Sequence, residues 1–250
     1  MFDAQQAFRA RCEWGEAGVQ RLAPLSDIVV VVDVLSFSTA VDIAVARGAV
    51  VYPYRWRDDR AERLASEVGA VLAVPRSGPG QTAPYSLSPA SLQAIPAGTR
   101  LVLPSPNGAT LSQLAAVHCP VVLAGCLRNA AAVASAVREL GGTVAVIAAG
   151  ERWVDAGDLS GSLRPAVEDL AGAGAILAAL SSTRPSPEAL VALAAWHAAQ
   201  THLDTFLATC ASGQELRERG FTQDVELAGL LDVSRTVPHL VDGAYRAWGT

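Results

Sequence analysis

Several side chains that could bind an anion or a metal follow the first strongly apolar run of the sequence. Asp33 comes directly after Ile28–Val32, and Ser36, Ser38 and Thr39 come next. Hydroxyls and free backbone N–H groups at a helix N-terminus form an anion site. A carboxylate leaving an apolar core is either a helix N-cap or a metal ligand or catalytic group. Both interpretations of this segment remain open.

Asn107-Gly108 lies between a strand-like and a helical segment, with Thr110 close by. Asn and Gly tolerate positive φ, so turn chemistry alone accounts for the pair. The functional alternative is a second helix start that faces a phosphate group.

Two further acidic groups interrupt apolar or helical segments. Glu168 and Asp169 are adjacent in an apolar helix expected over 163–180. They either complement the helix dipole, or one binds Mg²⁺ while the other orients water or an Arg. Asp224, close to Glu226, is either part of a solvated helix start or a metal ligand.

Other reactive residue types have structural interpretations. Cys126 has no His nearby in sequence and is expected to be structural, and the four cysteines form no CxxC pair. Gly172 and Gly174 lie inside a helical run without a preceding strand, so they indicate helix packing rather than dinucleotide binding.

Strands and helices must position these side chains, and the sequence predicts them by alternating apolar runs and helical patterns. The pattern predicts an α/β fold, a mostly parallel sheet with helices on both faces, plus a mainly helical C-terminal region over 186–232. The domain prediction is a single unit over 1–250, with lobes 1–180 and 181–250 left open. Ligands bind beyond the carboxyl ends of such strands. We expect strands near 27–33, 49–53, 70–74, 100–103, 121–124 and 143–148, helices near 37–48, 58–68, 109–117, 129–140 and 163–180, and strand-like tails at 237–240 and 244–248.

Composition excludes several classes of protein. The chain has 250 residues, 51% hydrophobic and 17% charged, which excludes intrinsic disorder. No apolar run reaches the roughly 18–20 residues of a membrane span, and we expect a cytoplasmic protein because the N-terminus lacks signal-peptide character. The net charge of −5 argues against nucleic acid as a partner. All 19 basic residues are Arg, so an anion must be held by Arg, backbone N–H groups or a metal.

At these residues the chain resembles the 2-phosphosulfolactate phosphatase family. The matching blocks occur in the family's order and span about 30–240 of the chain. They are Val30–Leu35 with Ser38-Thr39, Ser86–Pro89, Ser105–Thr110, Gly125–Val133, Ala148–Glu151, Ala166–Gly174 and Ser212–Asp232 before Val237-Pro238.

The resemblance implies an α/β, Mg²⁺-dependent phosphatase that hydrolyses 2-phospho-3-sulfolactate or a related small phospho-acid. It places Asp33, Asn107, Glu168, Asp169 and Asp224 where the family's acids and amides cluster. The resulting assignments are catalytic Asp33, Asp169 and Asn107; metal-binding Asp33, Glu168 and Asp224; and substrate-binding Ser36, Ser38, Thr39, Gly108, Arg128, Arg152 and Arg164.

Two departures from the family pattern affect the anion site. Ser36 stands where the family usually has Arg, and Pro75–Gly78 replaces a Gly-Glu-Arg-Gly-Gly block. A lost Arg removes a bidentate anion contact, and a replacement is available among Arg76, Arg128, Arg152 and Arg164. The alternative is an inactive anion-binding or regulatory protein on the same scaffold. A homo-oligomer is also left open.

Overall fold

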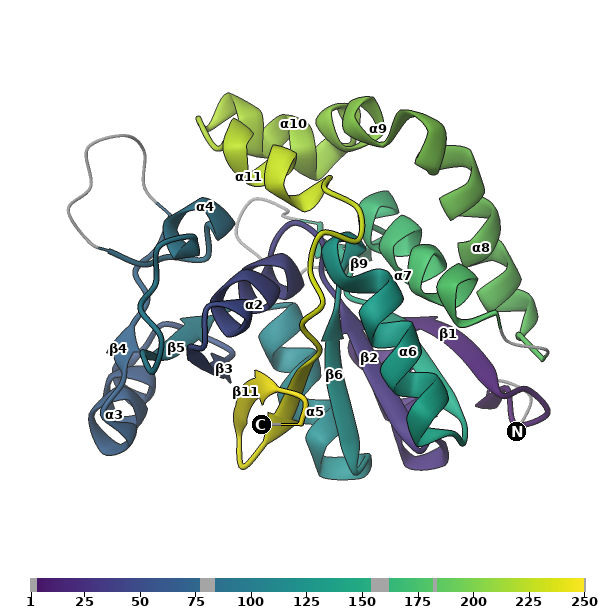
Figure 1. Cartoon of the computed structure of the whole chain (residues 1–250), viewed down its shortest axis with the longest axis horizontal. Helices are drawn as coiled ribbons and strands as arrows, with labels where there is room; N and C mark the ends of the chain where they lie inside the picture. The colour runs from purple at the N-terminus through teal and green to yellow at the C-terminus, as the bar shows by residue number, and fades with distance from the viewer. Residues whose placement is uncertain (1–3, 77–83, 154–161, 182–183, 250) are drawn as a thin grey trace.

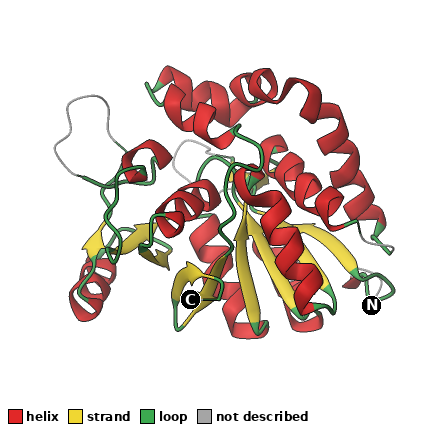
Figure 2. Cartoon of the chain, viewed as in Figure 1, coloured by secondary structure: helices red, strands yellow, loops and turns green. Residues whose placement is uncertain are grey.

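In the computed structural model, which describes residues 4–76, 84–153, 162–181 and 184–249, helices cover both faces of a large sheet (Figures 1 and 2). The order of its strands is β1-β7-β2-β6-β10-β11-β3-β5-β4, and β8 pairs with β9 separately. The strands are β1 (Ala10–Trp14), β2 (Ile28–Val32), β3 (Val50–Tyr54), β4 (Val71–Leu72), β5 (Arg100–Pro104), β6 (Val121–Gly125), β7 (Val144–Ala148), β8 (Glu151–Arg152), β9 (Leu163–Arg164), β10 (Pro238–Val241) and β11 (Ala244–Ala247).

Two parallel groups of strands make up most of the sheet. One is β1-β7-β2-β6 and the other is β3-β5-β4. The hairpin β10–β11 joins them, antiparallel to β6 on one side and to β3 on the other. The predicted mostly parallel sheet and its strand-like tail are therefore confirmed, and the last strands of the chain lie inside the sheet rather than at its edge.

The helices connect successive strands and then continue into a helical C-terminal region. None in the described part of the chain is both long and apolar enough to cross a membrane. They are α1 (Gly15–Leu22), α2 (Phe37–Ala46), α3 (Asp59–Val68), α4 (Pro89–Leu92), α5 (Gly108–His118), α6 (Ala130–Leu140), α7 (Val167–Leu180), α8 (Pro187–Ala199), α9 (Leu203–Thr209), α10 (Ala211–Glu218) and α11 (Thr222–Ala228), with 3₁₀ turns η2 (Ala23–Leu25), η3 (Leu127–Asn129) and η4 (Gln200–His202).

Strand β2 shows why the sheet is covered on both sides. All five of its residues are buried. Val30 and Val32 pack in the core that includes residues of α6 and α7, whereas Val29 and Val31 pack in the core that includes α1 and α5 residues. Successive side chains of a strand point to opposite faces, so an uninterrupted apolar run requires a helix layer on each face.

Two parts of the sequence prediction differ from the structure. The polar N-terminal segment contains β1, which pairs in parallel with β7, and then α1. The expected helix over 163–180 begins only at Val167, because Leu163–Arg164 forms β9. Pro165 explains why the helix begins later than expected, because the residue before a proline favours extended backbone.

The helical C-terminal region is confirmed and covers one end of the sheet. In Figure 1, α9, α10 and α11 lie above the sheet, and α8 runs down beside α7. Residues of α10 line the same cavity as Asp33, which follows β2. This arrangement places the C-terminal helices over the strand ends where the sequence predicted a site.

Candidate active site

The turn after β2 fixes the carboxylate of Asp33. Its Oδ1 accepts a hydrogen bond from the backbone N–H of Phe37 (3.0 Å), at the start of α2. Its Oδ2 accepts one from the backbone N–H of Gly108 (2.9 Å), at the start of α5. Asp33 is therefore an N-terminal acceptor for two helices, and it still lines a cavity.

The hydroxyls that follow Asp33 divide into two groups. Ser38 and Thr39 are fully buried, and they donate to the carbonyls of Val31 and Val34. These two hydroxyls stabilise the turn and are not among the described residues that line the cavity. Ser36 does line it, and its Oγ accepts a hydrogen bond from Nη2 of Arg76.

Asn107 and Glu151 join the ends of two distant segments. Asn107 Nδ2 donates to Glu151 Oε2 at 2.8 Å. Burial, together with the nearby carboxylates of Asp33 and Glu168, raises the pKa of Glu151 to about 7. A carboxyl group with that pKa is suited to exchange a proton near neutral pH.

Asp169 connects the ends of β2 and β7. Its Oδ1 accepts from the backbone N–H of Val34 (2.7 Å), and its Oδ2 from that of Gly150 (2.9 Å). Burial raises the pKa of Asp169 well above its ordinary value, and neighbouring Asp33 and Glu168 raise it further. The adjacent Glu168 is also buried. Asp169 thus positions the loops around Asp33, and it is not among the described residues that line the cavity.

A cavity of about 210 Å³, here called the acid cavity, brings several of these groups together. Three carboxylates, three hydroxyls, an amide and two guanidinium groups belong to the residues that line it. It is lined by Asp33, Leu35, Ser36, Arg76, Leu87, Ser105, Pro106, Asn107, Glu151, Ser212, Glu215, Leu216 and Arg219.

Burial and charge oppose each other at Asp33. Burial raises the pKa of its carboxyl group, while the N–H donors of Phe37 and Gly108 and the charge of Arg76 lower it. The negative charge of Glu168 raises the pKa of Asp33 further. A cation would relieve this accumulation of negative charge.

The predicted arginines lie in different places. Arg152 lines an adjoining cavity of about 290 Å³, which shares Asn107 and Glu151 with the acid cavity, and it pairs with Glu16 at 2.6 Å. Arg164 donates to Ser212 Oγ (3.2 Å).

Arg128 lies outside the residues that line either cavity. Its Nε pairs with Asp42 at 3.0 Å, and its Nη1 donates to the carbonyl of Leu227 (2.9 Å). These contacts tie the turn after β6 to α2 and α11.

Asp224 lies beside the acid cavity rather than among its acids. Its Oδ1 accepts hydrogen bonds from Ser88 Oγ and Ala90 N, and its Oδ2 is 3.5 Å from Nε of Arg76. Asp224 is one of the three residues predicted to bind a metal. In the structure it pairs with a cation of the protein, the guanidinium of Arg76.

A magnesium ion fits the chemistry of the remaining acids. Among the described residues, no three His, Cys, Asp or Glu side chains converge to hold an ion by themselves. Mg²⁺ does not need such a cage, because it is usually held by one or two carboxylates, several waters and the phosphate of a substrate. Asp33 supplies an oxygen donor at the acid cavity, and the buried Glu168, which is not among the described residues that line it, adds negative charge nearby.

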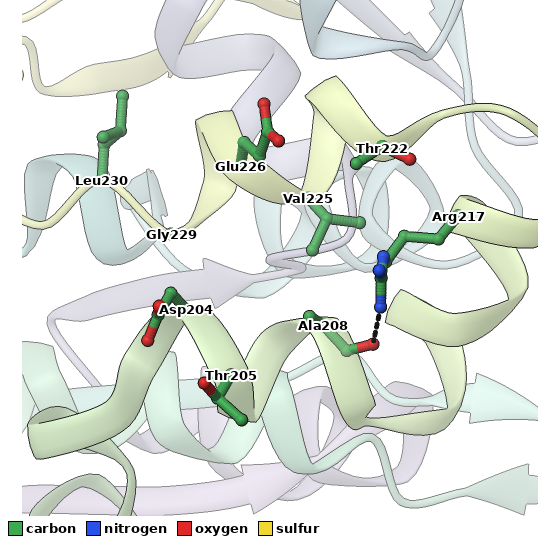
Figure 3. Close-up of a pocket in the computed structure, with 9 residues that line it drawn as sticks. All are labelled: Asp204, Thr205, Ala208, Arg217, Thr222, Val225, Glu226, Gly229 and Leu230. Carbon is green, nitrogen blue, oxygen red and sulfur yellow. Dashed lines mark hydrogen bonds between the residues drawn. The ribbon is translucent and has the colours of Figure 1, made fainter.

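A different cavity lies within the C-terminal helices (Figure 3). It has a volume of about 380 Å³ and is lined by residues of α9, α10 and α11 and of the turn after α11. Its Arg217 donates to the carbonyl of Ala208 (3.2 Å). Asp33, Glu151 and Arg76 do not line it, so we place the candidate active site at the acid cavity.

The sequence does not single out two residues that the structure places in the acid cavity, Glu151 and Arg76. Glu151 follows β7 at the predicted edge of the sheet, but the sequence pattern assigns it no role. Arg76 was only one of several arginines available for an anion. The signal for Glu151 was its place after a buried strand. No local pattern distinguishes Arg76, because its contacts with Ser36 and Asp224 come from distant segments.

Together the fold and the acid cavity define a class of protein: an α/β protein with a candidate site for a small polar ligand at the carboxyl ends of its strands. A family model described as 2-phosphosulpholactate phosphatase matches residues 18–243. The chain therefore belongs to the 2-phosphosulpholactate phosphatase family, as the sequence resemblance indicated, and is a phosphoric monoester hydrolase of that type.

Two relatives agree with this assignment. The "Probable 2-phosphosulfolactate phosphatase" of Carboxydothermus hydrogenoformans is 31% identical over 224 residues, which cover 86% of this chain and 87% of that protein. The "2-phosphosulfolactate phosphatase" of Methanothermobacter thermautotrophicus is 30% identical over 219 residues, covering 87% and 88% of the two chains.

Proposed function

We propose that this chain is a Mg²⁺-dependent phosphatase that hydrolyses 2-phospho-3-sulfolactate or a closely related small phospho-acid. The observation that carries the proposal is the convergence of Asp33, Glu151 and Arg76 on one cavity of about 210 Å³. The family and its relatives supply the substrate class.

Five of the residues that line the cavity have a role in this reaction: Asp33, Ser36, Arg76, Asn107 and Glu151. The guanidinium of Arg76 and the hydroxyl of Ser36 bind phosphoryl oxygens. Asp33, held by two backbone N–H groups, accepts a hydrogen bond from the attacking water and orients it toward phosphorus. Such positioning and charge neutralisation supply most of the catalysis in phosphoryl transfer.

Glu151 handles the proton of the leaving group. As the water oxygen bonds to phosphorus and the bond between phosphorus and the ester oxygen breaks, protonated Glu151 donates its proton to the ester oxygen, which leaves as the hydroxyl of the product acid. The phosphate product carries both protons of the water and returns one of them to Glu151. Asn107 holds the other carboxyl oxygen by its N–H, so Oε1 is the oxygen that carries the proton. A pKa of about 7 keeps this proton available at neutral pH.

Mg²⁺, when bound, neutralises charge on the phosphoryl oxygens as a Lewis acid. Asp33 and Glu168 are the carboxylates that we assign to it. The buried negative charge around them is the physical basis of the assignment.

Phosphate release from 2-phospho-3-sulfolactate and a panel of small phospho-acids tests the proposal. We expect turnover with Mg²⁺, none with EDTA, and at least about a 10³-fold loss of kcat in Asp33→Asn. A folded protein that binds phosphate but turns over nothing in the panel would instead be the inactive anion-binding protein.

A further inference from the structure

Arg76 is held at the wall of the acid cavity by contacts on several sides. Its Nη2 donates to Ser36 Oγ and to the carbonyl of Leu87 (3.1 Å). Its guanidinium carbon lies 5.7 Å from the centre of the Phe221 ring. The side chain is only 12% exposed. Its Nη1 has no hydrogen-bond partner among the described residues, which leaves that donor for a ligand.

Asp224 contacts two different elements with its two oxygens. Oδ1 accepts from Ser88 Oγ (2.6 Å) and from the backbone N–H of Ala90 (3.0 Å), at the start of α4. Oδ2 makes no hydrogen bond within the described chain, and it faces Nε of Arg76 at 3.5 Å. The Asp224 side chain is 1% exposed, so water does not compete effectively for this oxygen.

Three carboxylates attract the same guanidinium. Burial lowers the pKa of Arg76, while the charges of Asp224 and, less strongly, of Asp33 and Glu151 raise it. Asp224 lies within ion-pair distance, whereas no ion pair joins Arg76 to Asp33 in the described structure. Without Asp224, the attraction of Asp33 would be opposed only by the contacts of Arg76 with Ser36, Leu87 and Phe221. A guanidinium drawn onto Asp33 would neutralise that carboxylate.

We infer that Asp224 is a positioning residue that keeps the Arg76 guanidinium directed at a phosphoryl group and away from Asp33. This inference rests on the proposed function of the acid cavity. It replaces the metal-binding role that the sequence predicted for Asp224. It also gives α11 a role in anion binding, although α11 contributes no residue to the cavity lining in the described chain.

A double-mutant cycle read by direct binding tests the inference. The probe is inorganic phosphate, and the readout is its Kd by calorimetry for the wild type, Asp224→Asn, Arg76→Gln and the double variant. We expect Asp224→Asn to weaken binding about tenfold in the wild-type background, and less than twofold when Arg76 is already Gln. Equal losses in both backgrounds would overturn the inference, because Asp224 would then act on the fold in general.

Ser88→Ala is the matched control. It removes a donor to Oδ1 of the same carboxylate and leaves Oδ2 facing Arg76. We expect it to lower thermal stability while the Kd for phosphate stays within twofold. A Ser88→Ala loss as large as that of Asp224→Asn would contradict a specific action through Arg76.

A spectroscopic readout keeps the inference testable if Asp224→Asn does not fold. The Nε–H signal of Arg76 in the wild type can be assigned by its loss in Arg76→Gln. We expect slow exchange with solvent, and fast exchange would overturn the inference. A wild-type protein that does not bind phosphate at all would refute the proposed site as well, which separates the two failures.

Discussion

The backbone N–H of Gly108 donates to Oδ2 of Asp33 at 2.9 Å, across 75 positions of sequence. This bond joins the start of α5 to the end of β2. It fixes one oxygen of the carboxylate on which the proposed reaction depends.

Gly108→Ala should disturb this bond directly. A Cβ at position 108 would lie 2.8 Å from Oδ2 of Asp33 and would also overlap the ring of Phe37. We expect kcat to fall by at least about tenfold. The far-UV circular dichroism spectrum should change little, because the secondary structure is retained. Gly229→Ala, at a helical φ of −77° where a Cβ would first meet the flexible end of the Leu207 side chain at 3.2 Å, controls for stability changes from a new side chain. Unchanged kcat in Gly108→Ala would argue against a fixed Asp33.

Glu151→Gln should change both the rate and its pH dependence. If Glu151 donates a proton, kcat of the wild type falls as pH rises through about 7, where that group loses its proton. The variant should lose about 10²- to 10⁴-fold in kcat and should lack this basic limb. Steady-state rates between pH 5.5 and 9 measure both effects. A variant that keeps the same basic limb would show that another group controls it.

The same carboxyl group makes stability depend on pH. Its pKa rises from an ordinary 4.5 to about 7 on folding, so the folded state binds more protons in that interval. Stability should therefore be greatest below about pH 4.5 for this group and should decline as pH rises through 7. In EDTA we expect Tm to fall by several degrees between pH 5 and 8. Glu151→Gln should flatten that slope, and an identical slope in the variant would refute the assignment.

Arg128→Gln should affect stability rather than substrate binding. The change leaves Asp42, which is fully buried, without its ionic partner, at a cost on the order of 3–5 kcal/mol. We expect a lower Tm with KM within twofold of the wild type. Adding Asp42→Asn removes the stranded charge and should recover part of the Tm. A raised KM with unchanged Tm would restore Arg128 as a substrate-binding residue.

The one-dimensional pattern determined much of the scaffold and the edge where the site lies. Val29–Val32 predicted a strand covered on both faces because an apolar side chain at every position needs burial on each side. The position of Asp33 after that strand predicted a place at the carboxyl edge, since parallel strands end together there. These outcomes depend on local periodicity, which a sequence displays directly.

Only the tertiary structure decided which side chains meet. Ser88 and Asp224 are 136 positions apart, and Asp33 and Gly108 are 75 apart. Asp224, predicted to bind metal, faces Arg76 and the start of α4, against which α11 packs. The hydroxyls of Ser38 and Thr39 turn back to the backbone rather than to a ligand. The physical reason is that residue type limits the bonds a group can make, whereas the packing of distant helices and strands determines which partner comes within a few ångströms.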